Sequence, residues 1–198
     1  MKAELLSQIE TTLNISADVK RATAAQCSAA ALSAAQMIAQ SLGNGGKLML
    51  CGNGGSAGDC QHIAAEFTAT LDHRRPRPGL AALALTTDTS FITAYANDFG
   101  FEGVFARQVQ ALGRAGDVLI GISTSGTSKN VVAAIEQAKS MDIKTIALTG
   151  SSGGTLAGIA DLLIAVPSDK TMHIQEGHIA LGHVITAAVE QMIAGPTE

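Results

Sequence analysis

The stretch Lys47-Leu-Met-Leu-Cys-Gly-Asn-Gly-Gly-Ser-Ala-Gly-Asp-Cys-Gln-His-Ile-Ala-Ala-Glu66 passes from apolar residues through glycines into helix-forming residues. This order predicts a strand, a turn and a helix. Gly52, Gly54 and Gly55 allow a sharp turn and a close backbone approach to a ligand, and Ser56 can cap the helix. The first helical amides would attract a phosphate or a sugar oxygen. A plain turn is the alternative, because the turn has neither the Walker Lys-Ser/Thr pair nor the dinucleotide-binding glycine spacing.

The predicted helix after this turn carries a histidine and a glutamate. His62 and Glu66 are four residues apart, so they lie on one helical face. Such a pair can bind a metal ion or move a proton. Taken alone, however, the pair is more typical of a solvated polar face.

Length and composition indicate one domain and exclude some partners. The 198 residues are 46% hydrophobic and 15% charged, which is enough for one substantial core. The formal net charge of -4 argues against broad electrostatic binding to nucleic acid or to an anionic membrane. No apolar run approaches the length of about 20 residues that spans a bilayer. We therefore expect neither nucleic acid nor membrane as a partner.

The cysteines and the start of the sequence indicate a cytoplasmic location. Cys27, Cys51 and Cys60 make an odd count without disulfide or zinc-knuckle spacing. The first residues, Met1-Lys-Ala-Glu-Leu-Leu6, lack the apolar region of a secretory signal. We expect a reducing compartment.

Residues 2–42 are rich in Ala, Leu, Gln and Ser, and their apolar residues recur at helical spacing. This pattern predicts two helices with a break near residues 14–18. Helices ahead of the first strand have no place in a minimal α/β sandwich, so they either pack against another subunit or cover an edge of the sheet.

Beyond residue 70, apolar runs alternate with helical patterns. Continuous apolar runs are typical of parallel strands covered on both faces, so the chain is predicted to be an α/β protein with a parallel sheet. Besides the strand at 47–50, we expect strands at 80–85, 117–122, 144–148 and 161–166, and helices at 91–97, 101–112, 131–141 and 173–193.

Hydroxyl side chains follow the clearest of these strands. Ser123-Thr-Ser-Gly-Thr-Ser128 lies between this strand and a helix starting near Lys129. Its hydroxyls and the helical amides can form a phosphate cradle. The alternative is a capping turn, but one cap needs only one hydroxyl. Ligands of such sheets bind at the carboxyl ends of the strands, where this loop and the glycine turn both fall.

The last predicted helix carries Gln175 and His183, eight residues apart. They lie about 80° from each other around a helix and two turns along it, so they can flank one site. Lone helical histidines are more often packed or surface residues than ligands.

Together these pieces resemble the sugar isomerase (SIS) domain family, and within it the phosphoheptose isomerases. The resemblance runs over nearly the whole chain and implies a three-layer α/β/α sandwich with a five-stranded parallel sheet and extra N-terminal helices. It also implies a homotetramer with active sites at subunit contacts. The motifs that carry it are Cys51-Gly-Asn-Gly-Gly-Ser56, His62-x-x-x-Glu66, Asn97-Asp-Phe-Gly100, Gly121-Ile-Ser-Thr-Ser-Gly126 with Ser128, and Gln175-Glu-x-His-x-x-x-x-His183.

The resemblance also implies the composition of the site. It implies one zinc ion per subunit, bound by His62, Glu66, Gln175 and His183. These donors suit zinc without excluding other divalent ions. The implied substrate contacts are Asn53, Gly54, Gly55, Ser56, Glu66, Asn97, Asp98, Ser123, Thr124, Ser125, Ser128 and Gln175, with the hydroxyl run at the phosphate end.

The implied reaction converts sedoheptulose 7-phosphate to an aldose heptose phosphate through an enediol, as the first step of ADP- or GDP-heptose synthesis. Glu66 is the candidate base at the substrate carbon, and His183 is the candidate acid and base at the oxygens. Zinc would polarise the carbonyl.

The chain departs from the family pattern four residues after the glutamate, where relatives carry Arg and this chain has Thr70. The basic loop at residues 70–79 is of a kind that usually faces solvent. Arg74 or Arg75 in this loop is a candidate replacement for the missing arginine.

Two other functions are considered. The first is a non-catalytic SIS protein that binds the bacterial replication initiator, but that relative lacks the counterparts of Glu66 and His183. The second is an arabinose 5-phosphate isomerase, whose usual form carries a regulatory extension after the SIS domain, whereas this sequence ends at Glu198.

Overall fold

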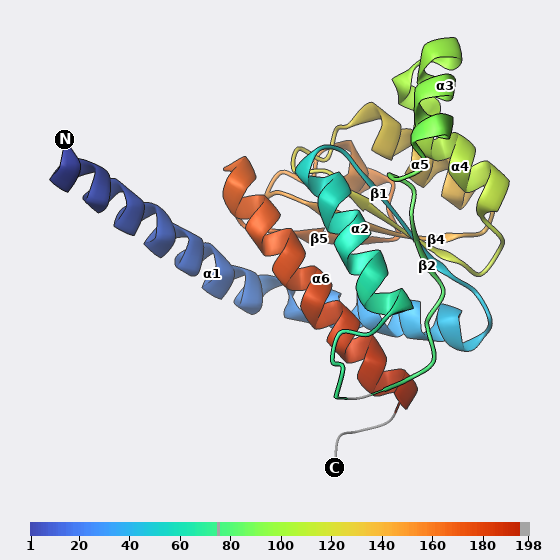
Figure 1. Cartoon of the computed structure of the whole chain (residues 1–198), viewed down its shortest axis with the longest axis horizontal. Helices are drawn as coiled ribbons and strands as arrows, with labels where there is room; N and C mark the ends of the chain where they lie inside the picture. The colour runs from blue at the N-terminus through green and yellow to red at the C-terminus, as the bar shows by residue number, and fades with distance from the viewer. Residues whose placement is uncertain (75, 195–198) are drawn as a thin grey trace.

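A computed structural model of the chain describes residues 1–74 and 76–194 (Figure 1). Helices and strands alternate along most of the chain. The elements are α1 (Lys2–Gly43), β1 (Leu48–Gly52), α2 (Gly55–Thr68), β2 (Ala82–Ala84), α3 (Thr89–Phe99), α4 (Val104–Leu112), β3 (Val118–Ile122), α5 (Lys129–Lys139), β4 (Lys144–Thr149), β5 (Leu162–Ala165) and α6 (Thr171–Ala194), with short 3₁₀ helices at Phe101–Gly103 and Thr155–Gly158.

The five strands form one parallel sheet in the order β2-β1-β3-β4-β5. In the sheet, β2 therefore lies on one side of β1, and β3 lies on the other side. Gly52 lies opposite Ile122 at the carboxyl ends of β1 and β3, so the loops that follow these strands are neighbours at the switch point. The predicted five-stranded parallel sheet is confirmed.

Helices cover both faces of the sheet, because successive strand residues point to opposite sides. Leu48 and Leu50 pack with residues of α1, α2 and α6, whereas Met49 and Cys51 pack with residues of α4 and α5. Helices α1, α2 and α6 therefore cover one face of the sheet, and α4 and α5 cover the other. This arrangement confirms the predicted three-layer α/β/α sandwich.

The break predicted near residues 14–18 is wrong, since α1 is one continuous helix from Lys2 to Gly43. The segment Asn14-Ile-Ser-Ala-Asp18 contains neither Gly nor Pro, and its residues each cost less than about 1 kcal/mol inside a helix. Ser16 is also buried and donates a hydrogen bond to Glu176 on α6, which holds this part of α1 in place.

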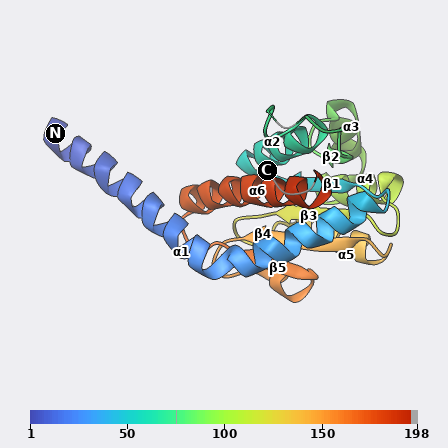
Figure 2. The ribbon, with the colours of Figure 1, turned by 90° about the horizontal axis from the view of Figure 1, so that it is seen from below.

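The two halves of α1 have different surroundings. The second half covers the sheet beside β5, where Cys27 donates to the Ala165 carbonyl and Ala34 and Ile38 are fully buried. The first half projects away from the body of the protein (Figures 1 and 2) and exposes Leu5, Leu6, Ile9 and Leu13. The alternative that this segment covers the sheet therefore holds for the second half of α1 only.

Other element boundaries shift modestly. The strand predicted at 80–85 is reduced to Ala82–Ala84 at the edge of the sheet, and the helix predicted from residue 101 starts with a 3₁₀ turn before α4. The helix predicted at 91–97 is longer, because Asp88 caps it by accepting from the Phe91 amide at 2.9 Å. Among the described residues, no helix combines the length and the apolar composition needed to cross a membrane.

His178 on α6 makes the stability of the fold depend on pH. Its side chain is fully buried, and its Nε2 donates to the Thr149 carbonyl at 3.0 Å. Its Nδ1 has no partner among residues 1–74 and 76–194. Burial lowers the pKa of His178 to about 4 from an ordinary value of 6.5. Between pH 6.5 and pH 4, His178 therefore binds a proton in the unfolded chain but stays neutral in the folded chain.

We predict that the free energy of unfolding falls over this range by up to about 3 kcal/mol on account of His178. Urea denaturation at pH 7 and pH 4.5 measures the fall. The His178→Gln variant keeps a donor for Thr149 without a titrating ring and should lose most of this pH dependence. An unchanged fall in the variant would assign it to other groups.

Candidate functional site

The glycine turn and the hydroxyl loop meet at the switch point of the sheet. Asn53 follows β1, and its amide exchanges two hydrogen bonds of 2.8 and 2.9 Å with the amide of Asn130 on α5. Asn130 is buried, so this pair ties the two loops together across the gap between β1 and β3. Sequence reasoning missed Asn130, because nothing local distinguishes it from other residues in the first turn of a helix.

Helix α2 starts directly at the glycine turn. Gly54 occupies the N-cap, and no side chain in the described part of the chain caps the first turn. The Ala57 amide donates to the Gly54 carbonyl at 3.0 Å, which leaves the Gly55 and Ser56 amides to bind an anion. Ser56 lies inside this turn and is buried, which corrects the expectation that it caps the helix. Gln175 reaches this turn from α6, and its amide nitrogen lies 2.8 Å from the position that a Cβ on Gly55 would occupy.

The hydroxyl loop is built as a cluster of mutually bonded side chains. Ser123 and Ser128 oxygens are 2.9 Å apart, and those of Ser125 and Thr127 are 3.0 Å apart. Among the described residues no side chain caps α5, so the hydroxyls do not serve as a helix cap. The Val131 amide donates to the Ser128 carbonyl at 3.0 Å, which leaves the Lys129 and Asn130 amides to bind an anion. The loop thus brings hydroxyl groups and a helix N-terminus to one place.

The backbone beneath the hydroxyl loop is fixed by the loop after β4. Gly126 has φ +68° and a Cβ there would overlap the Gly153 carbonyl, so the two loops pack backbone against backbone. The Gly150 amide donates to the Thr124 carbonyl at 2.9 Å. A pocket of about 210 Å³ opens beside this contact, lined by Thr124, Ser125, Ser151, Ser152, Ser168 and Thr171 among others.

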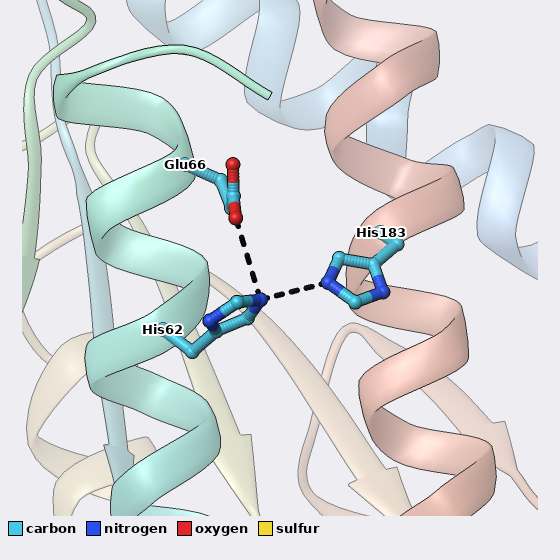
Figure 3. A group of neighbouring side chains, drawn as sticks. All are labelled: His62, Glu66 and His183. Atoms are coloured by element: carbon cyan, nitrogen blue, oxygen red, sulfur yellow. Dashed lines mark hydrogen bonds and ion pairs between the residues drawn. The ribbon is translucent and has the colours of Figure 1, made fainter. Parts of the chain in front are cut away.

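Three side chains from α2 and α6 form a second cluster (Figure 3). His62 Nε2 lies 2.8 Å from His183 Nε2 and 3.3 Å from Glu66 Oε1. The two imidazole rings meet edge to face with centroids 5.0 Å apart. Glu66 is mostly buried, with 20% of its side chain exposed, whereas His62 is about half exposed. The structure therefore brings together three of the predicted metal ligands.

The close crossing of α2 and α6 makes this cluster possible. Gly182 precedes His183, and a Cβ on it would lie 2.5 Å from Cδ1 of Ile63, the residue after His62. Ile63 is itself buried in the core. Only glycine at position 182 therefore lets the two helices approach until the histidines touch.

The three side chains fit a divalent metal ion. Imidazole nitrogens and a carboxylate oxygen are donors that zinc prefers, and two ligands on one tetrahedral zinc ion lie about 3.3 Å apart. The donor atoms of His62, Glu66 and His183 all lie within 4.8 Å of one another. A slight separation of the two rings would admit the ion.

A further acidic residue lies near this cluster. Asp59 precedes His62 by about one turn of α2, and its Oδ2 is buried without a hydrogen-bond partner in the part of the chain that the structure describes. Burial raises the pKa of the Asp59 carboxyl, and His62 and His183 partly offset this effect. Sequence reasoning did not select Asp59, because the burial of its Oδ2 is not visible in the local sequence.

Other predicted site residues lie apart from the histidine cluster. Gln175 lies against Gly55, which precedes His62 by seven residues, or about 10 Å along α2. Asn97 and Asp98 are exposed near the end of α3, where the Asn97 amide donates to Asp98 at 2.8 Å. Figure 1 shows α3 standing away from α2 and α6.

The basic loop lies at the opposite end of α2 from the glycine turn (Figure 1). Arg74 is 79% exposed and bonds both oxygens of Asp72 at 2.9 and 3.2 Å. These hydrogen bonds lower the pKa of Asp72. Thr70 lies near Glu190 on α6, with 3.4 Å between their side-chain oxygens. The predicted alternative Arg75 lies outside the described residues.

The Gly182 crossing leads to a prediction about metal binding. Gly182→Ala should force α2 and α6 apart by more than the slight separation that an ion needs, and should weaken binding of Zn²⁺ or Co²⁺ by at least about tenfold, because the two histidines are then held too far apart. Isothermal titration of the metal-stripped protein measures the affinity. Gly58→Ala on α2, where a Cβ meets nothing within 4 Å, is the matched control and should bind normally. Equal affinities in both variants would contradict this account.

Comparison with known proteins places the chain among relatives of similar length. The family model described as SIS domain matches residues 13–150. A phosphoheptose isomerase from Roseiflexus sp. (strain RS-1) is 51% identical over 181 residues, which is 91% of each chain. One from Burkholderia pseudomallei (strain K96243) is 54% identical over 78% of each chain. The solved phosphoheptose isomerase of Neisseria gonorrhoeae is 45% identical, with a TM-score of 0.89 over 94% of this chain and 99% of that one.

Proposed function

The chain belongs to the phosphoheptose isomerase family of SIS-domain proteins, and we propose that it converts sedoheptulose 7-phosphate to D-glycero-D-manno-heptose 7-phosphate. The observation that carries this proposal is the contact of His62, Glu66 and His183 between α2 and α6. It supplies a carboxylate and an imidazole for moving protons. Neither a non-catalytic regulator nor an arabinose 5-phosphate isomerase is favoured, because relatives at about half identity are phosphoheptose isomerases.

The reaction is an internal oxidation and reduction that needs only proton transfers. Glu66 takes a proton from C1 of the ketose, which leaves an enediol, and returns a proton to C2. His183 carries a proton between the oxygens on C1 and C2, so that the carbonyl at C2 becomes a hydroxyl and the hydroxyl at C1 becomes the aldehyde. Partial burial of Glu66 limits the exposure of its carboxylate to water.

We assign the phosphate to the hydroxyl loop. No basic residue lies within Ser123–Ser128, so hydroxyls and the free amides of α5 would bind the anion. Asn53, Gly54 and Gly55 lie beside this loop across the switch point, where they would contact the sugar. Thr124 and Ser125 also line the neighbouring pocket.

The proposed cofactor is one zinc ion per subunit, bound by His62, Glu66 and His183 together with Gln175. A divalent ion there would supply Lewis-acid polarisation of the substrate carbonyl. The Gln175 amide lies toward the glycine turn, so its addition to the other ligands requires a shift of its side chain or a contribution from a second subunit.

We propose a homotetramer with active sites at subunit contacts. Glu66 lies eleven residues beyond Gly55, about 16 Å along α2, so the chemical cluster and the phosphate loop of one chain are separated. Asn97 and Asp98 belong to α3, which lies away from α2 and α6. The first half of α1 exposes an apolar surface that a neighbouring subunit would bury.

The proposed setting is the cytoplasm, where the product enters heptose synthesis for lipopolysaccharide. Cys27, Cys51 and Cys60 are buried and unpaired with one another, and burial raises the pKa of Cys51 to about 12. Such thiols are inert structural residues that fit a reducing compartment.

The test of this function is conversion of sedoheptulose 7-phosphate by the purified protein. Glu66→Gln should lower kcat by about 10²- to 10⁴-fold, because it removes the base and retains the shape of the side chain. Calorimetry should still detect binding of the sugar phosphate to this variant. No turnover by the wild-type protein, or full turnover by Glu66→Gln, would refute the proposed function.

The phosphate assignment has a separate test. Ser125→Ala should raise KM by about tenfold or more, because a hydrogen bond to a charged group contributes roughly 1.5 to 3 kcal/mol. Its thermal stability should change little, since Ser125 lies in a loop. If KM is unchanged in Ser125→Ala but rises strongly in Arg74→Ala, the phosphate lies at the basic loop.

A further inference from the structure

Arg77 is a buried arginine whose donors are all used. A guanidinium carries five N–H groups, and Arg77 Nε donates to Glu190 Oε1 at 2.8 Å. Nη1 donates to the carbonyls of Phe67 and Pro78 at 2.9 and 3.0 Å. Nη2 donates to the Glu66 carbonyl at 2.8 Å and lies 2.6 Å from Glu190 Oε1. The side chain therefore joins the end of α2 to α6.

The pair is deeply buried and well satisfied. Only 4% of the Arg77 side chain and 8% of the Glu190 side chain are exposed. Glu190 also accepts from the Leu71 amide at 3.0 Å, so it fixes the chain that leaves α2. A buried charged pair with all its donors matched is costly to break from one side.

The Arg77–Glu190 pair contacts the same two helices, α2 and α6, that carry the histidine cluster. Glu66 and Phe67 belong to the last turn of α2, whose carbonyls have no partner within the helix. The Arg77 guanidinium donates hydrogen bonds to the carbonyls of both residues. Glu190 follows His183 by seven residues, which places both on the same face of α6 about 10 Å apart. The helices are thus joined twice, by the histidines and by Arg77.

We propose that Arg77, held by Glu190, is a positioning residue for the isomerase reaction, a role that rests on the proposed function. Arg77 keeps the last turn of α2 helical and at a fixed distance from α6. The Glu66 side chain belongs to that turn, so its direction toward His62 and His183 depends on the contacts of Arg77 with Glu190 and with the helical carbonyls. Without these contacts the last turn of α2 frays, and the Glu66 carboxylate loses its alignment with the substrate carbon.

The test compares Arg77→Lys with the wild-type protein. Lysine retains the charge but cannot reach Glu190 and both helical carbonyls at once. We expect kcat per folded subunit to fall by about 10- to 100-fold, as misplacement of a reacting group by about 1 Å can produce. KM should change less than about threefold, because the phosphate loop lies at the far end of α2. Arg114→Lys, at an exposed arginine before β3, is the matched control.

Each outcome decides a separate question. Absence of turnover in the wild-type protein refutes the proposed function itself. Wild-type turnover with normal kcat in Arg77→Lys overturns the positioning role, and so does a loss that disappears when rates are normalised to the folded fraction. If Arg77→Lys does not fold, Arg77→Leu/Glu190→Leu removes both charges together, and the same fall in kcat with steady KM is expected.

Discussion

The close crossing of α2 and α6 is the constraint on which the candidate site depends. Because Gly182 has no side chain, Ile63 packs against its backbone, and the neighbouring residues His62 and His183 come within 2.8 Å. Arg77 and Glu190 join the same two helices further along. A carboxylate and two imidazoles therefore gather on helices that are distant in sequence, at a distance set by backbone packing rather than by flexible loops.

The other end of the candidate site consists of the glycine turn and the hydroxyl loop, which the sheet holds in position. Parallel pairing of β1 with β3 places the glycine turn beside the hydroxyl loop, and the Asn53–Asn130 pair fixes the two loops relative to each other. In the proposed assignment, the first amides of α2 and α5 would bind the phosphate in a protein of negative net charge. In the proposed tetramer, these two regions of different subunits would complete one site.

Much of the fold follows from local sequence, because apolar runs indicate the strands and glycines or hydroxyls mark the loops after β1 and β3. The continuous α1 did not follow, since a polar segment without Gly or Pro interrupts the pattern but not the helix. His62, Glu66 and His183 could be selected by spacing and resemblance. Asn130 and Arg77 could not, because their partners come from packing, and neighbouring arginines in the basic loop look alike until burial separates Arg77 from Arg74. Asp59 could not either, because the burial of its Oδ2 is not visible in the local sequence.

Turnover in D₂O tests the central claim most directly, namely that the crossing of α2 and α6 aligns a base for proton transfer between C1 and C2. The account predicts that solvent deuterium appears at C2 of the aldose made by the wild-type protein and that Glu66→Gln loses this exchange, as followed by proton NMR. Product formed without deuterium would show that the hydrogen passes from C1 to C2 without exchange with solvent, as in a direct hydride transfer. Exchange that persists in Glu66→Gln would assign the base to another residue. Either result would contradict the account.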